Sequence, residues 1–236
     1  MALTPEIFGS TIVARGAFNP AIFSPDWLEN NGLLGAEDSS AARQAPSMMV
    51  SHQISVFETD WFTIQVLENQ FVLQSKGALS PAFTDLAAGT LTLLPHTPIT
   101  AIGLNYVGHY RLQTENDYHR VGDVLAPKTI WNELYPDENS SAGLSNLTIL
   151  IRQTKRGKLP QTGDAKAITV QPSERIKFGV LMSYNDHHEV SANESNNQTS
   201  AERAVEIVTL DWESSWKDAL RVFDGVISKA LASPEE

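Results

Sequence analysis

The sequence contains no cysteine among its 236 residues. This absence excludes disulfide bonds, thiolate catalysis, zinc ribbons and iron–sulfur clusters, and it suits a reducing compartment. Long apolar runs are also lacking: no stretch approaches the roughly 18 residues that a membrane helix needs. The N-terminus has neither the basic start nor the unbroken apolar run of a signal peptide. We therefore expect a cytoplasmic protein that does not contact membranes.

Sequence signatures of catalysis are absent as well. There is no G-x-S-x-G for a serine nucleophile, no P-loop, and no G-x-G-x-x-G that follows a strand. The sequence therefore predicts no catalytic residue and no cofactor.

The charge is strongly acidic overall but unevenly placed. The formal net charge is −11, which opposes binding of the whole protein to a phosphate backbone. The segment 150–180 nevertheless carries seven basic residues against Asp164 and Glu174, a local excess of five positive charges. This segment indicates a basic hairpin that complements an acidic surface on the same fold or on a partner, whereas a nucleic-acid contact is a weaker alternative because no aromatic residues interleave with the basic ones. Its partner-binding candidates are Arg152, Lys155, Arg156 and Lys158.

Hydrophobic periodicity predicts a mixed α+β fold. Apolar residues recur at helical spacing near 80–94 and over 200–232, and a short helix is expected at 126–134. The segment 35–46 is small and polar and is expected to be a loop. We predict one or more antiparallel sheets with helices packed on one face. The expected strands lie at 54–56, 61–66, 71–73, 99–112, with possible bulge points at Gly103 and Gly108, and at 147–151, 167–170 and 177–190.

The turn-rich segment 136–143 divides the chain into two parts. We predict an N-terminal β-rich half-unit at 1–138, with its helix near 80–94, and a C-terminal half-unit at 139–236, with its helix near 200–232. Each part offers strands, a hairpin and a long helix, so the halves could be related by duplication. The alternative, a single continuous domain, stays open.

Four segments resemble a group of sporadically distributed bacterial proteins with no assigned activity. They are FNPAIFSPDWL, HQISVFETDWFTIQVLENQFVL, LLPHTPITAIGLNYVGHYRL and the run that ends in SYNDHHEV. The resemblance implies a prokaryotic source and a scattered gene history, and a phage-defence or toxin–antitoxin setting would fit it. Its motifs are apolar and aromatic, so it implies no catalytic residue.

The strongest candidates for metal ligands lie near the end of the last expected strand. Alternate residues of a strand share a face, so His187 and Glu189 would face one side and His188 the other. His109, from the other long strand, could join them as a ligand of zinc or manganese. A polar strand end without any function is the favoured interpretation, since no H-x-H or H-E-x-x-H spacing is present. Asp117 and His119 fall in an expected loop and are interpreted in the same way.

Three functions therefore stay open. The preferred one is a non-enzymatic interaction or accessory protein that binds a protein partner or itself, through the basic hairpin and through Trp212 and Trp216 of the last helix. The alternatives are a metal-dependent hydrolase or nuclease-like enzyme and a nucleic-acid-binding saddle.

Overall fold

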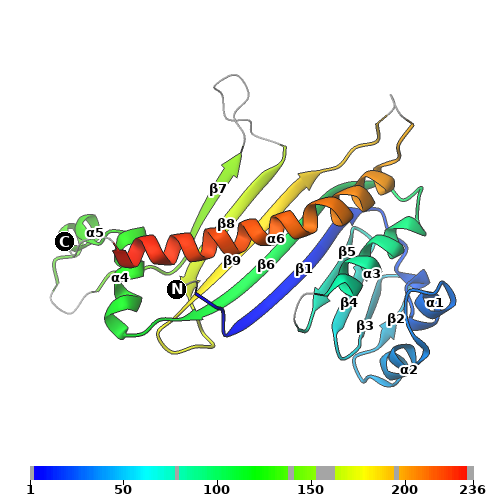
Figure 1. Cartoon of the computed structure of the whole chain (residues 1–236), viewed down its shortest axis with the longest axis horizontal. Helices are drawn as coiled ribbons and strands as arrows, with labels where there is room; N and C mark the ends of the chain where they lie inside the picture. Colours follow the sequence, from blue (N-terminus) through cyan, green and yellow to red (C-terminus); the bar gives the residue numbers. More distant parts are fainter. Residues whose placement is uncertain (1–2, 78–79, 138–140, 153–162, 194–196, 233–236) are drawn as a thin grey trace.

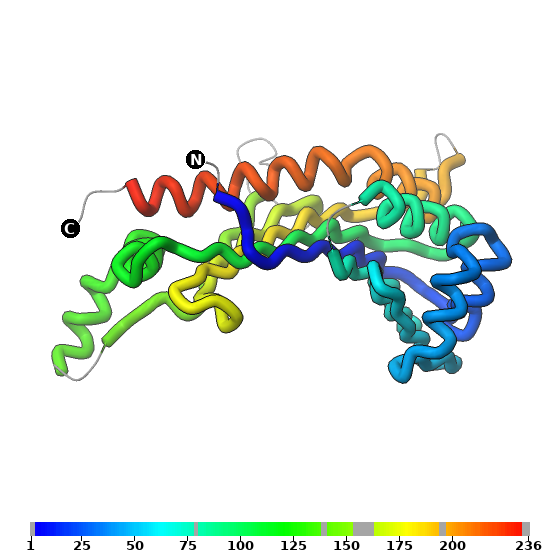
Figure 2. The backbone as a smooth tube through the Cα atoms, turned by 60° about the horizontal axis from the view of Figure 1, so that its bottom comes forward, coloured from blue at the N-terminus to red at the C-terminus, as the bar shows by residue number. Residues whose placement is uncertain are grey.

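A computed structural model describes residues 3–77, 80–137, 141–152, 163–193 and 197–232. Its strands form one nine-stranded antiparallel sheet whose helices all lie on one face, as predicted (Figures 1 and 2). Among the described residues, no helix combines the length and apolarity needed to cross a membrane. In chain order the elements are β1 (Ile7–Gly16), the 3-10 helix η1 (Pro20–Ile22), α1 (Pro25–Asn30), α2 (Ala36–Gln44), β2 (Met49–Val50), β3 (Ile54–Glu58), β4 (Phe62–Leu67), β5 (Gln70–Ser75), α3 (Pro81–Thr92), β6 (Ile99–Arg111), α4 (Glu115–Leu125), α5 (Thr129–Leu134), β7 (Leu147–Arg152), β8 (Ala165–Pro172), β9 (Gly179–Glu189) and α6 (Ser200–Ala232).

The sheet contains a topological repeat. Its strand order is β2-β3-β4-β5-β1-β6-β9-β8-β7, with β1 and β6 paired at the centre. On each side, a long strand is followed by two helices, a meander and a longer helix. The first repeat consists of β1, α1, α2, β3, β4, β5 and α3. The second repeat consists, in the same order, of β6, α4, α5, β7, β8, β9 and α6. β2 has no counterpart among the described strands.

This repeat divides the chain between α3 and β6. The division that the sequence predicts at residue 138 would instead fall between α5 and β7. Strands from both predicted parts belong to the same sheet. The two long strands β6 and β9 are neighbours in the sheet and do not occupy equivalent positions in the repeat.

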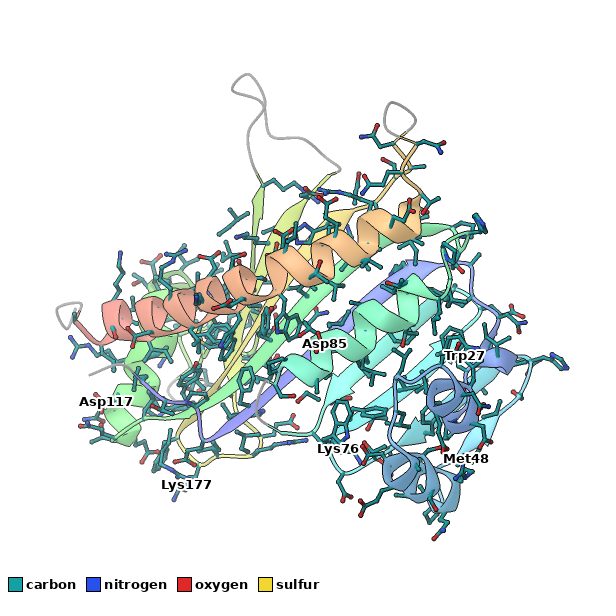
Figure 3. The ribbon with its side chains drawn as sticks, turned by 45° about the vertical axis from the view of Figure 1, so that its right-hand side comes forward. Trp27, Met48, Lys76, Asp85, Asp117 and Lys177 are labelled. Carbon is teal, nitrogen blue, oxygen red and sulfur yellow. The ribbon has the colours of Figure 1, made fainter. Side chains whose placement is uncertain are left out.

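Helix α6 crosses the centre of the sheet and forms the main core with it. The helix is continuous over 33 residues. Its buried residues recur at three- and four-residue spacing, so one stripe faces the sheet. The ring of Trp212 lies between Phe83 of α3 and Tyr106 of β6, with centroid distances of 5.5 and 5.0 Å. α3 therefore packs beside α6 over the same face (Figure 3).

Two expected loops are helices, and two expected bulges are absent. Segment 35–46 was expected to be a loop but forms α2, whose Ser39 and Ala42 are buried. The segment that contains Asp117 and His119 forms α4. The pairing of β6 with β1 and β9 passes through Gly103 and Gly108 without a register shift. Gly108 is instead explained by a close neighbour, because a Cβ there would lie 2.8 Å from the ring of Tyr110.

The other face of the sheet carries no helix among the described residues, and the sheet arches around it (Figure 2). Its centre is neutral and polar. The side-chain amide of Asn185 donates a hydrogen bond of 2.6 Å to Asn105 on the neighbouring strand. Asn105 in turn donates to the backbone carbonyl of Thr11. This curved face has the shape of a saddle, and uncharged polar groups lie at its centre.

Candidate interaction surface

Helix α5 presents its apolar side chains to solvent. Its six residues include Ile130, Trp131 and Leu134, and Tyr135 follows at the C-cap. Residues 130, 131 and 134 share one side of the helix because three- and four-residue spacings bring side chains together. All four side chains are 52–67% exposed. Large exposed apolar groups, with aromatics among them, are typical of the centre of a protein interface.

Local interactions hold α5 in this exposed position. α4 begins with a capping box: the Thr114 hydroxyl accepts a hydrogen bond from the backbone N–H of Asp117, and the Asp117 carboxylate accepts one from the backbone N–H of Thr114. Val121 anchors the middle of α4 in the core. Lys128, at the start of α5, then lies 2.9 Å from Asp123 of α4. The position of α5 thus follows from a capped, anchored helix and an ion pair.

Strand β7 is equally exposed. It lies at one edge of the sheet and pairs with β8 along one side only in the described structure. Three consecutive residues, Ile149, Leu150 and Ile151, are each about half exposed, at 48–51%. Since consecutive strand residues point to opposite faces, β7 exposes apolar surface on both faces of the sheet. We call the exposed side chains of α5, Tyr135 and β7 together the apolar end.

The equivalent elements of the first repeat are covered. Phe23, between η1 and α1, is fully buried against Phe71 of β5, with ring centroids 6.0 Å apart. The buried Ser55 hydroxyl of β3 donates a hydrogen bond to the carbonyl of Phe23. Phe57 of β3 is fully buried. Trp27, labelled in Figure 3, packs against Phe23 from α1. At this end the helices therefore cover the outer strands, whereas β7 is left open.

The two predicted partner-binding tryptophans pack against the sheet, Trp212 within the core and Trp216 partly buried at its margin. Trp212 is 8% exposed, and its backbone carbonyl accepts a hydrogen bond from the hydroxyl of Tyr106. Trp216 packs against Phe8, with ring centroids 4.4 Å apart. Their four-residue spacing follows the side of α6 that faces the sheet, where Trp212 is buried and Trp216 is partly buried. Arg152 lies at the end of β7, next to the apolar end, and Lys155, Arg156 and Lys158 lie outside the described residues.

The four candidate metal ligands do not converge. His109 is opposite Leu181 and His187 is opposite Gly103, so six residues, or about 20 Å of strand, separate the two imidazoles. His188 faces α6, on the other side of the sheet from His187. Glu189 accepts a hydrogen bond from the backbone of Gly163. Among the described residues, no three side chains of the ligand type gather into a metal-sized cluster.

His109 has a structural environment of its own. Its Nδ1 lies 2.7 Å from the Ser173 hydroxyl in the loop before β9. Burial, assisted by the nearby Arg175 charge, lowers the pKa of His109. A neutral imidazole that is hydrogen-bonded to a loop hydroxyl serves to hold that loop.

A polar network lies between β8, β9 and α6. The Lys166 ammonium and the Tyr184 hydroxyl both donate to one carboxylate oxygen of Asp218, at 2.7 and 2.6 Å. Burial opposes ionisation of Asp218, but these two donors and Arg221 hold its pKa well below the usual range. Burial and the Asp218 carboxylate raise the pKa of Tyr184. These side chains are hydrogen-bonded to one another. The network therefore fixes α6 over the sheet, and none of its members is a free acid or base.

An Asp–His pair lies beside this network on β9. The Asp186 carboxylate is 3.5 Å from Nε2 of His188, and both side chains are largely buried. Burial alone would lower the pKa of His188, but Asp186 raises it above the ordinary value. Burial works in the opposite sense on Asp186, whose pKa is nevertheless lowered by His188. When His188 is protonated, the two side chains form a buried ion pair under α6.

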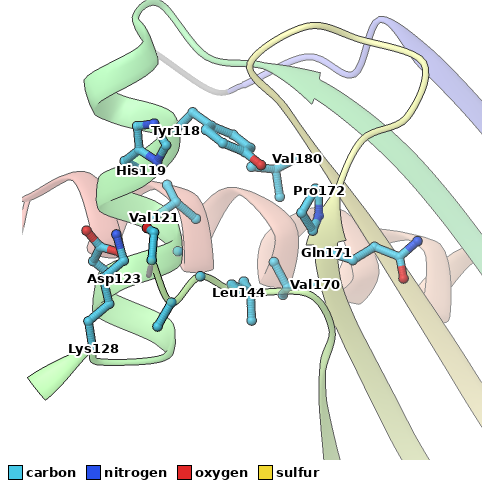
Figure 4. A pocket seen from close by; sticks show the side chains of 14 residues that line it. Tyr118, His119, Val121, Asp123, Lys128, Leu144, Val170, Gln171, Pro172 and Val180 are labelled. Atoms are coloured by element: carbon cyan, nitrogen blue, oxygen red, sulfur yellow. The ribbon is translucent and has the colours of Figure 1, made fainter. Parts of the chain in front are cut away.

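A pocket lies between α4 and strands β8 and β9 (Figure 4). Tyr118 and His119 approach it from α4, and Val170 and Pro172 line it from β8. The carboxylate that sequence analysis paired with His119 is not available to it, because Asp117 belongs to the capping box. His119 has Glu115 as its nearby carboxylate instead, at 3.8 Å on the surface of the helix. Asp123 also lines the pocket, and its carboxylate lies 2.9 Å from the ammonium of Lys128.

No family model matches this chain, and no curated protein matches it. The resemblance to sporadically distributed bacterial proteins therefore stays a prediction. The apolar end was missed by sequence analysis as a binding surface, although its strand and its short helix were both predicted. The one available signal was composition: β7 has no charged residue before Arg152, which is unusual for an exposed sheet edge.

Proposed function

We propose that this protein is a non-enzymatic interaction subunit that binds a protein chain through the apolar end. The observation that carries the proposal is the exposure of seven large apolar side chains on α5, Tyr135 and β7. The equivalent elements of the first repeat bury theirs. A surface that one repeat covers and the other exposes is typical of a binding site.

The size of this surface supports the proposal. Monomeric proteins typically expose apolar patches of about 300–600 Å². With typical residue areas, the exposed fractions of the seven side chains sum to roughly 800 Å², divided between α5 with Tyr135 and the two faces of β7. Trp131 and Tyr135 are also of the residue types that most often dominate binding energy.

The chain offers a matched control for a binding experiment. Leu210 of α6 is 67% exposed and lies outside the apolar end. We would compare the parent protein, the double variant Trp131→Ala/Leu134→Ala and the control Leu210→Ala by affinity capture from the native host. The double variant is expected to lose at least 90% of the captured partner while its circular dichroism is unchanged, and the control is expected to behave like the parent. Equal capture by all three would contradict the proposal.

The two other functions have less support. A metal-dependent enzyme would need ligands from His109, His187, His188 and Glu189, which lie on different faces or about 20 Å apart. A nucleic-acid saddle would use the curved face, whose central side chains are uncharged, and the protein carries a net charge of −11. Metal content and the salt dependence of nucleic-acid binding would test these alternatives directly.

A further inference from the structure

The two edges of the sheet differ by one strand. In the first repeat, β3 is covered along its outer side by β2, with Met49 opposite Val56 and Val50 opposite Ser55. In the second repeat, β7 occupies the position of β3. Among the described residues, no strand lies beside β7 in the place that β2 takes beside β3. Unpaired backbone N–H and C=O groups on an apolar edge are a template for another strand.

We infer that β7 pairs antiparallel with β7 of a second copy of this chain and joins the two sheets into one. The inference rests on the proposed function, and it names both the partner and the register. Ile149 of one copy lies opposite Ile149 of the other, and Leu147 lies opposite Ile151. The second copy thereby takes the place that β2 holds in the first repeat.

The register follows from the faces of β7. Its pairing with β8 puts Ile149 opposite Ile168 and Leu147 opposite Val170, on the face that carries α6. In an antiparallel pair related by a two-fold axis perpendicular to the sheet, opposite residues share a face. Centring the pair on Ile149 sets Leu147, Ile149 and Ile151 against Ile151, Ile149 and Leu147, and it sets Thr148 against Leu150 on the other face. A slip of one residue would put apolar side chains on mismatched faces.

The sequence of β7 is therefore complementary to itself, which selects a second copy over an unrelated strand. The exchange is reciprocal, as an isologous two-fold interface requires.

The neighbouring helix supplies the rest of the area. Figures 1 and 2 show α5 beyond the start of β7, on the side of its free edge. An antiparallel second β7 would end near this helix. Ile130, Trp131 and Leu134 of α5 would therefore add apolar contacts to those of the paired strands.

The absence of cysteine allows a direct test of the register. In the variant Ile149→Cys, the single thiol of each copy would face its equivalent, so mild oxidation or a short bismaleimide should link most of the protein into covalent dimers. Leu147→Cys alone should not cross-link, because its equivalent lies four residues away along the strand. Leu210→Cys is the control on α6, with an exposed thiol outside β7.

Sedimentation equilibrium measures the same interface without a cross-link. The parent protein is expected to be a dimer, and Ile149→Lys should weaken dimerisation at least 100-fold. The milder Ile149→Thr should weaken it about tenfold, and it keeps a β-branched side chain in case lysine disturbs the fold. Leu210→Lys should leave the dimer unchanged.

Two results would overturn the inference. A parent protein that is monomeric at 100-fold the concentration of the capture experiment would exclude the second copy as partner. A dimer that persists in Ile149→Lys, with no covalent dimer from Ile149→Cys, would place the contact elsewhere. If a monomeric parent still loses its captured partner on Trp131→Ala/Leu134→Ala, the proposed function stands and only the β7 pairing fails. If the parent is monomeric and capture is independent of α5, both fail.

Discussion

The two ends of the sheet are built from the same sequence of elements but are finished differently. At the first end, η1, α1 and α2 cover the outer strands, and a two-residue strand closes the edge. Met49 and Val50 of that short strand are the large apolar side chains left exposed there. At the second end, α5 and β7 leave seven such side chains exposed. The repeated order of elements thus does not determine how much apolar surface is exposed at each end. The side chains of the two helices that follow each long strand determine it.

The difference extends to the way each half is fixed to its long helix. On β5 the residues that face the helices are Phe71, Leu73 and Ser75, two of them apolar. The corresponding strand β9 presents Tyr184, Asp186 and His188 to α6. The first half therefore depends on ring packing, and the second half depends on buried polar pairs as well.

The largest expected contrast is between the stability losses caused by removing an aromatic ring at each end of the sheet. Phe23→Ala removes a fully buried ring and should lower the free energy of unfolding by about 3–5 kcal/mol. Trp131→Ala removes a ring that is half exposed, so we expect a loss below about 1 kcal/mol in the monomer. Urea denaturation measured at a protein concentration that keeps the chain monomeric distinguishes the two. Comparable losses would show that α5 is packed as firmly as α1.

Much of this fold could be predicted from the sequence because its core elements have strong periodicity. α3 and α6 bury residues at helical spacing, and buried and exposed residues alternate in β3, β4 and β5. Both patterns can be recognised in the sequence. α2 was missed because its segment is polar and buries only Ser39 and Ala42. α4 was missed although its start carries a signal: Thr114 and Asp117 have the spacing of a capping box.

The candidate surface could not be predicted in the same way. Trp212 and Trp216 recur at a spacing that identifies a helix face, but the spacing does not say whether that face meets the sheet or a partner. The run from Ile149 to Ile151 predicts a strand, and its exposure depends on what lies beside it in the sheet. The position of β7 at an edge is a property of the topology, which links residues far apart in the chain.

A second contrast tests the polar attachment of α6. Asp218→Ala would leave the Tyr184 hydroxyl and the Lys166 ammonium without their acceptor. Because an unsatisfied buried polar group costs more than the hydrogen bond is worth, we expect a loss of about 1–3 kcal/mol. The matched change Glu213→Ala, on the same helix, removes a carboxylate that is 77% exposed and paired with the exposed Lys217, so its effect should be below about 1 kcal/mol. Equal effects on the urea midpoint would show that the network adds little stability.

The ion pair of β9 makes the stability of the second half depend on pH. The folded-state pKa of His188 is raised, so its contribution is fully present below the unfolded value of about 6.5 and is lost as pH rises through the folded pKa. The pKa of Asp186 is lowered, so its contribution is present above about pH 3.9 and is lost as pH falls through its folded value. Both contributions are therefore present between these limits.

His188→Gln should remove the upper part of this dependence. The melting temperature of the parent should exceed that of the variant most clearly near pH 6, and the difference should shrink as pH rises. The other charges that act on His188 are Asp164 and Asp211, and both are retained in the variant. A difference that is constant from pH 6 to pH 9 would mean that the imidazole is not charged in the folded protein.

The smallest expected effects are at the helix starts, where the two repeats agree. Ser24 caps α1 by accepting a hydrogen bond from the backbone N–H of Trp27, and Thr114 caps α4 at the equivalent position. Ser24→Ala and Thr114→Ala should each cost about 1 kcal/mol, since each leaves an amide at a helix start without its side-chain acceptor. Similar urea midpoints for the two variants are expected, because capping is local and does not depend on what covers the outer strands. A cost confined to Ser24→Ala would instead mean that α4 and α5 are held weakly until a partner binds, and it would extend the difference between the two ends from their surfaces to their helices.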